Sequence, residues 1–210
     1  MATRYYKPLR NGNDKIDCLT FSLPPGKSCP TAKKYKCFSS GCYGTKGRLA
    51  MPASRKLYER NFEMAKHNLP ALEALIVKQL KHSRKEAVRI HVVGDFFSQP
   101  YVDMWCRIAR NVSQKRFFFY TKTAELFDFS EFLSLPNVSG NNSVLPVYGG
   151  QCNFGTQFEI DELEDAMEKQ GVPYTHCLCD KGYHDKRCGV ACDACWKPTG
   201  EWKYVTFIKH

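Results

Sequence analysis

The sequence contains no long run of apolar residues. Nowhere do about 18 consecutive apolar residues occur, the length that a membrane-spanning helix needs, so no membrane association is expected. The opening stretch MATRYYKPLRNGNDK also has no apolar segment, which predicts that there is no signal peptide and that the protein is cytoplasmic. Internal repeats and low-complexity segments are absent too, which argues against a solenoid and against a disordered chain.

The composition is that of a folded chain with a basic surface. Hydrophobic residues make up 43% and aromatic residues 13% of 210 residues, which predicts one α/β domain over 1–210 with a packed core. The formal charge of +10 favours an anionic partner such as nucleic acid, or a host protein. This count treats every cysteine as neutral, so thiolates bound to metal would make the effective charge smaller.

Eleven cysteines occur, and most of them fall into two groups. Disulfides are rare in a reducing compartment, so metal ligation is the favoured reason for the groups. The first group, Cys29, Cys37 and Cys42 in segment 26–47, has gaps of seven and four residues, unlike the C-x2-C pairs of structural zinc sites. Three widely spaced thiolates favour an iron–sulfur cluster of the 4Fe-4S type with one open iron; a zinc-stapled loop is the alternative.

The second group lies near the C-terminus, in segment 176–197. Its pair Cys192-x2-Cys195 is typical of metal sites, and the pair Cys177 and Cys179 would complete a tetrahedral zinc site. Zinc and iron–sulfur ligation stay equally open here, as does donation of a fourth ligand to the first cluster. The neighbouring histidines, His176 and His184, are more typical of ordinary surface residues. The predicted metal ligands of this group are Cys177, Cys179, Cys188, Cys192 and Cys195.

A strand–helix–strand pattern lies in the middle of the chain. AVRIHVVGDFF (87–97) and RFFFYTKT (116–123) are continuous apolar strands around a helix at 98–113, which is typical of a parallel βαβ unit. This pattern predicts an α/β fold with a small, incomplete β/α barrel-like parallel sheet between the two cysteine-rich segments. Other helices are expected at 54–83, broken at Pro70 and capped by Ser54 and Asn68, at 129–135 and at 160–171; other strands are expected at 143–150, 172–176 and 201–208.

Functional groups in parallel α/β folds gather where the strands end. Gly94 and Asp95 follow the first of these strands, where glycine lets a ligand approach the backbone and the carboxylate can accept hydrogen bonds from an amine or ribose. The alternative is a plain exit turn in which Asp95 or Ser98 caps the next helix. Lys122, at the end of the second strand, faces an anion or reaches solvent. Gly94 and Asp95 are therefore predicted to bind a cofactor, and Asp95 and Lys122 to be catalytic if the protein is an enzyme.

Four stretches carry a family resemblance. FSLPPGKSCP, CYGTKGR, RIHVVGDFFSQPYVDMW and FFFYTKT resemble the gene product 88 family of phages and prophages, over roughly residues 18–125, and CGVACDACW resembles the C-terminal signature of some members. The segment order is also similar to a radical S-adenosylmethionine half-barrel. That resemblance implies a cluster on Cys29, Cys37 and Cys42 and an S-adenosylmethionine amino group at Gly94-Asp95, although the loop lacks C-x3-C-x2-C and Gly94-Asp95 replaces Gly-Gly-Glu.

These observations lead to two main hypotheses of different class. The first is a phage-type iron–sulfur protein in the host bacterial cytoplasm, with radical S-adenosylmethionine-like redox activity left open. The second is a zinc-stabilised basic binding protein that engages nucleic acid or a host protein. A redox or iron-sensing switch, in which cluster loss changes partner binding, is a third.

Overall fold

The computed structural model describes residues 6–12, 17–35, 37, 42–146, 151–152, 154–155, 157–177, 195 and 197–208. Its centre is a five-stranded sheet with the strands in chain order. The first pair is antiparallel, and the other three pairs are parallel. The strands are β1 (Arg10–Asn11), β2 (Leu19–Thr20), β3 (Ala87–Ile90), β4 (Arg116–Thr121) and β5 (Val138–Asn142).

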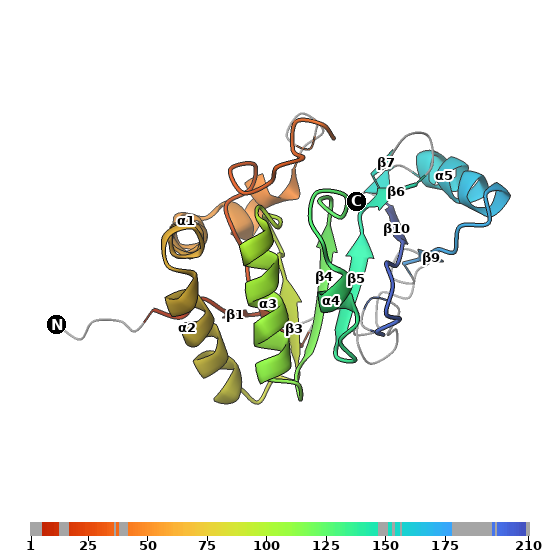
Figure 1. The fold of residues 1–210 in the computed structure, drawn as a ribbon. Coiled ribbons are helices and arrows are strands. Elements are labelled where there is room, and N and C mark those ends of the chain that lie inside the picture. The colour runs from red at the N-terminus through yellow and green to blue at the C-terminus, as the bar shows by residue number, and fades with distance from the viewer. Residues whose placement is uncertain are drawn as a thin grey trace.

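The helices that connect these strands lie along one side of the sheet, as Figure 1 shows. They are α1 (Pro52–His67), α2 (Leu69–Lys81), α3 (Gln99–Asn111) and α4 (Ser130–Leu133). Because parallel strands that follow one another in a single direction are joined by right-handed crossovers, each connecting helix falls on the same side. We call this side the helix face and the opposite side the second face.

The main core fills the space between the helix face and the helices. Alternate strand residues such as Val88, Ile90 and Phe119 point into it and are fully buried. Trp105 on α3 lies at its centre, with its ring centroid 5.2 Å from that of Phe21. Cys106 on the same helix is buried, as its apolar neighbours predict. The observed fold is therefore a mixed α/β structure with a mostly parallel sheet, which confirms the predicted class.

The C-terminal part of the chain forms smaller sheets beside β5. Lys203 bridges to Asn141, which joins the last segment to the edge of the central sheet. Helix α5 (Gln157–Lys169) packs against the last strand. The strands are β6 (Val144–Leu145) paired with β7 (Gln151–Cys152), and β8 (Phe154–Gly155), β9 (Thr175–His176) and β10 (Val205–Ile208) in the order β8-β10-β9.

Two predictions about the strands need revision. The segment 87–97, expected to be a strand and its exit turn, is a strand only to Ile90, because His91 adopts a left-handed backbone conformation with φ of 59°. Strand β5 was not expected, because VSGNN reads as a loop. Closure into an incomplete barrel stays a prediction, since the described strands pair in three separate sheets.

The cysteine-rich segments are described only in part. The N-terminal one contains two short 3-10 helices, η1 (Tyr43–Thr45) and η2 (Gly47–Ala50). In the C-terminal one, Cys179, Cys188 and Cys192 lie outside the described residues. None of the helices in the described ranges is both long enough and apolar enough to cross a membrane.

The boundary between α1 and α2 gives a test of capping. Asn68 Oδ1 accepts a hydrogen bond from the Ala71 backbone nitrogen at 3.2 Å, which confirms its predicted role as the cap of α2. Asn68→Ala should lower the free energy of unfolding by about 1 kcal/mol. Ser54, the other predicted cap, instead lies inside α1 and donates to the Arg48 carbonyl, because α1 begins at Pro52. Ser54→Ala is the control and should change stability by less than about 0.5 kcal/mol in urea unfolding; equal losses would contradict the capping assignment.

Candidate functional site

Asp95 stands at the carboxyl edge of the sheet and connects the ends of β3 and β4. Its Oδ1 accepts hydrogen bonds from the Phe96 backbone nitrogen at 2.8 Å and from Thr121 Oγ1 at 2.5 Å. Its Oδ2 accepts from the Lys122 backbone nitrogen at 2.9 Å. The side chain is buried, with 6% of the residue exposed. These contacts make Asp95 a link between two strand ends, in place of a cap on α3.

Burial and hydrogen bonding act on Asp95 in opposite directions. Loss of water around the carboxyl raises the pKa of Asp95, and this is the largest effect. The hydrogen bonds from Thr121, Lys122 and Phe96 lower the pKa, and so does the charge of the Lys122 ammonium. Lys122 therefore acts on Asp95 through both its backbone and its charge. The cofactor-binding and catalytic roles of the two residues stay predictions.

Gly94 brings the backbone after β3 against the start of the cysteine loop. Its φ is +86°, and a Cβ placed there would lie 2.6 Å from Leu23 Cβ and 2.7 Å from Ser28 Oγ. The backbone of Leu23 also donates to the Val93 carbonyl at 2.9 Å. Glycine is thus needed for close approach of the chain to itself. Cofactor binding at Gly94 stays a prediction.

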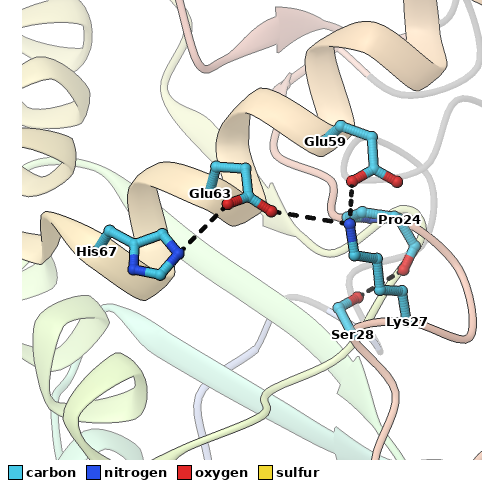
Figure 2. A network of polar contacts seen from close by, with 6 residues as sticks. All are labelled: Pro24, Lys27, Ser28, Glu59, Glu63 and His67. Carbon is cyan, nitrogen blue, oxygen red and sulfur yellow. Dashed lines mark hydrogen bonds and ion pairs between the residues drawn. The ribbon is translucent and has the colours of Figure 1, made fainter.

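The first residues of the cysteine loop are fixed to α1, as Figure 2 shows. Lys27 Nζ lies 2.6 Å from Glu59 Oε2 and 3.7 Å from Glu63 Oε1. Ser28 Oγ donates to the Pro24 carbonyl at 2.7 Å. The ion pairs are exposed and contribute little energy, whereas the serine is buried. Together with the close approach at Gly94, these contacts fix the backbone position at which Cys29 follows.

Cys29 and Cys42 lie beside Asp95 at this edge. The pKa of the Cys29 thiol is raised to about 12. Burial is the main cause, and the neighbouring Asp95 and Cys42 contribute in the same direction. The loop returns to the sheet at Tyr43, whose hydroxyl donates to the Val92 carbonyl. Of the three predicted ligands of this loop, Cys29 and Cys42 therefore lie near enough to influence each other electrostatically. Within the described ranges, no three His, Cys, Asp or Glu side chains converge closely enough to hold a metal ion, so Cys37 does not join them in this structure.

The second face of the sheet lies against Cys195 and near Cys177, the two C-terminal cysteines that the structure describes. The Tyr120 hydroxyl on β4 donates a hydrogen bond to Cys195 Sγ. Burial raises the pKa of Tyr120 well above its usual value, and the Cys195 and Cys177 thiols raise it further. Cys18, which no motif assigned, also lies on this face: burial raises the pKa of its thiol to about 11, while the Arg89 charge lowers it.

Two histidines differ from their sequence-based interpretation or extend it. His91 is buried as expected, and its Nε2 lies 2.9 Å from the Tyr101 hydroxyl. His176, expected at the surface, has only 8% of its side chain exposed, and its Nδ1 lies 2.6 Å from Glu164 Oε1. The surface interpretation of His176 is therefore wrong, because Glu164 on α5 lies against its ring.

The fold and this edge define a class of α/β protein: helices cover one face of a mostly parallel sheet, and thiols with a buried carboxyl group gather where the strands end. The family model described as gene product 88 matches residues 2–197. The chain belongs to the gene product 88 family, as the sequence resemblance predicted.

Two phage proteins are similar to the chain. It is 29% identical over 150 residues to the Gene 88 protein of Mycobacterium phage D29, covering 66% of this chain and 62% of the relative. It is 29% identical over 146 residues to the Gene 88 protein of Mycobacterium phage L5, covering 63% of this chain and 60% of the relative. The matches thus span less than two thirds of these relatives. No solved structure matches the chain, and the comparisons do not support the resemblance to radical S-adenosylmethionine half-barrels.

Proposed function

We propose that this protein is a phage-type iron–sulfur protein whose cluster is bound by Cys29, Cys37 and Cys42, with the C-terminal cysteines as a second metal site. The observation that carries the proposal is the placement of Cys29 and Cys42 beside Asp95 at the carboxyl edge of the sheet. Ligands of α/β proteins bind at this edge. Thiolate sulfur is the donor that iron–sulfur clusters require. The incomplete barrel belongs to the same proposal, with the second face as its interior.

The electrostatics of the edge favour a cation. Cys29 sits where burial and two neighbouring acidic groups oppose its ionisation. A bound iron centre reverses this balance, because it replaces the thiol proton and its positive charge attracts Cys42 and Asp95. The same arrangement without a metal keeps the Cys29 thiol protonated and a poor nucleophile, which argues against an unassisted cysteine enzyme.

The proposal requires the loop to rearrange. The three sulfurs do not converge in this structure, so binding has to draw Cys37 toward Cys29 and Cys42. Metal binding is coupled to folding, so part of the binding free energy would order the ligand loop. Limited proteolysis of the loop should therefore be slower in iron-loaded protein than in the apoprotein, with equal cleavage elsewhere.

The decisive experiment is metal and sulfide analysis of protein purified without oxygen. Iron with acid-labile sulfide is expected, together with visible sulfur-to-iron charge-transfer absorption. The double variant Cys29→Ser/Cys42→Ser should lose this iron, while Cys177→Ser/Cys195→Ser should retain it and lose only metal from the second site. The control Cys106→Ala removes a core thiol of α3 and should keep the full metal content. Folded protein that contains neither iron nor zinc would contradict the proposal.

The second candidate is a zinc-stabilised protein that binds nucleic acid or a host protein. The formal charge of +10 favours it. Colourless protein with stoichiometric zinc, and DNA or RNA binding that weakens as salt increases, would select this function over the first. A switch in which cluster loss changes partner binding predicts different DNA affinities for the metal-loaded and metal-free forms.

Catalytic activity at Asp95 and Lys122 is a separate part of the proposal. Asp95 Oδ2 accepts a hydrogen bond from the Lys122 backbone and has the capacity for a second donor, such as the amine of S-adenosylmethionine. Asp95→Asn keeps an oxygen acceptor but not the charge. If the carboxylate binds a cationic amine, this variant should keep its iron and lose binding of S-adenosylmethionine in calorimetry; equal binding by both proteins would remove Asp95 from the site.

A further inference from the structure

The second face of the sheet carries several polar side chains beside a small apolar cluster of Cys18, Ala87 and Phe118. Arg89 on β3, Tyr120 on β4 and Asn141 on β5 point to this face, opposite the alternate residues of the core. Asn141 is fully buried, yet its Oδ1 has no hydrogen-bond partner among the described residues. The Nε of Arg89 is likewise buried and unpartnered there. Buried polar groups are nearly always paired, so this face is built to meet a polar or charged group.

The group that reaches this face is the backbone and sulfur of Cys195. Its carbonyl accepts hydrogen bonds from Ser139 Oγ at 2.8 Å and from Asn141 Nδ2 at 3.3 Å. Its sulfur accepts from the Tyr120 hydroxyl. Cys177 also acts electrostatically on that hydroxyl. Two cysteines of the C-terminal group thus act on one tyrosine, Cys195 through a hydrogen bond and Cys177 through its electrostatic effect.

Arg89 adds a positive charge to the same place. Its guanidinium carbon lies 5.7 Å from the centroid of the Tyr120 ring. No carboxylate forms an ion pair with Arg89 within the described part of the chain. A cation held against a sheet face calls for a compensating negative charge. Thiolates bound to a divalent metal supply one, because each sulfur beyond the second makes the centre more negative.

We propose that Arg89 and Tyr120 are positioning residues of a metal–thiolate centre that includes Cys177 and Cys195. The Tyr120 hydroxyl donates a hydrogen bond to the Cys195 sulfur and so fixes the orientation of that sulfur. Arg89 balances the charge of the thiolates from the sheet. This inference rests on the proposed role of the C-terminal cysteines as metal ligands and names the residues of the sheet that tune them.

The metal used to test the proposal is zinc, because structural zinc sites are closed thiolate sites. Cobalt is the second probe, because its visible spectrum reports sulfur ligation. Tyr120→Phe should weaken zinc binding by about 10- to 100-fold, the usual effect of removing an outer hydrogen bond to a metal ligand. It should also shift the sulfur-to-cobalt charge-transfer band. Arg89→Met should weaken zinc binding similarly, and Arg89→Lys, which keeps the charge, should restore part of the affinity.

The matched control is Tyr101→Phe. Tyr101 is a fully buried tyrosine whose hydroxyl contacts His91 and Trp105, and it lies on α3, away from the second face. Its zinc affinity and cobalt spectrum should match those of the unmodified protein. Thermal unfolding of each variant without metal checks that it is folded.

The outcomes distinguish the metal site itself from the role of Arg89 and Tyr120. If the unmodified protein binds neither zinc nor cobalt, the metal role of the C-terminal cysteines fails and this inference fails with it. If it binds zinc, but Tyr120→Phe, Arg89→Met and Tyr101→Phe all bind equally tightly with the same cobalt spectrum, the metal centre stands and the role of Arg89 and Tyr120 is refuted. Loss confined to the second-face variants supports it.

Discussion

Replacing Gly94 with alanine is expected to lower the free energy of unfolding by about 3 kcal/mol, the sum of left-handed backbone strain and overpacking. The backbone has φ of +86°, and the added methyl group would lie 2.6 Å from Leu23 Cβ and 3.0 Å from the Leu23 carbonyl oxygen. A backbone atom cannot move aside as the end of a long side chain does. The collision would therefore displace the start of the cysteine loop from β3.

The matched control is Gly171→Ala after α5. Its φ is +67°, but no atom lies within 4 Å of the added Cβ. Only the backbone strain applies, so its cost should be about 1 kcal/mol. Urea unfolding of both variants gives the comparison directly. Equal losses at the two glycines would show that close approach to Leu23 contributes nothing.

The difference also bears on the site. Ser28 lies under the same Cβ position as Leu23, and Cys29 follows it in the chain. If the proposed cluster is bound at Cys29, Gly94→Ala should reduce iron content as well as stability. Gly171→Ala, far along the chain, should keep full iron content. The pair thus separates a general loss of stability from a local displacement of the cysteine loop.

Local pattern was sufficient for most of the helix-face structure. Apolar spacing and Pro70 predicted the break between α1 and α2, and Asn68 is the observed cap. The apolar run at β4 predicted a buried strand. These features depend on residues near one another in the sequence, so a single chain is enough to reveal them.

Strand β5 shows where local pattern fails. VSGNN has the polar composition of a loop, yet all five residues are buried. Ser139 and Asn141 donate to the Cys195 carbonyl, and Asn141 also donates to the Phe119 carbonyl. One of these partners, Cys195, is more than fifty residues away in the chain, and the other, Phe119, lies on the neighbouring strand β4. Neither contact can be inferred from the periodicity of the sequence.

The candidate site was predicted in part for the same reason. The rule that functional groups gather where parallel strands end placed Asp95 and Lys122 together, and the structure brings them into contact. This rule did not identify Arg89 and Tyr120 as site residues, because a continuous apolar strand is expected to be buried by apolar groups on both faces. Knowing that helices cover only one face requires the strand order, which no local pattern supplies.

The second-face residues and the carboxyl-edge residues divide the thiols of this protein into two environments. At the edge, Cys29 has acidic neighbours, Asp95 and Cys42. On the second face, Arg89 is a cationic neighbour of both Cys18 and Tyr120, and Lys85 and Asp17 also act on Cys18 with opposite signs. An acidic surrounding favours a more positively charged centre, and a basic one favours a centre rich in thiolate. The two cysteine groups are therefore expected to differ in metal affinity and to be separable by graded chelation.

Acidification provides the last test, through His91. Burial lowers the pKa of His91 from 6.5 to about 3 in the folded protein. The unfolded chain therefore binds the proton more readily between these values. The stability that the neutral ring contributes is complete above pH 6.5 and is lost progressively as the pH falls below it. Integrating this linkage predicts a loss of about 2 kcal/mol between about pH 7 and about pH 5.

Asp95 acts with the opposite sign. Burial raises its pKa above 3.8, so the folded state holds this proton more strongly and acidification relieves a cost. Total stability therefore mixes the two groups, and a variant is needed to separate them. His91→Asn is suitable, because asparagine tolerates the left-handed backbone that His91 adopts, with φ of 59°, and it does not titrate.

His91→Asn should be less stable than the unmodified protein at neutral pH, because the ring packs against Phe96 with centroids 4.6 Å apart. Its stability should nevertheless fall less steeply on acidification, by the contribution of His91. His67→Asn is the control: its side chain is 67% accessible and its ion pair with Glu63 is exposed and weak, so the slope should change little. Urea unfolding across this range measures all three slopes. Parallel slopes for His91→Asn and the unmodified protein would contradict the prediction. They would mean that the imidazole of His91 is protonated as easily in the folded protein as in the unfolded chain. Water or a carboxylate would then have to reach the interior behind β3.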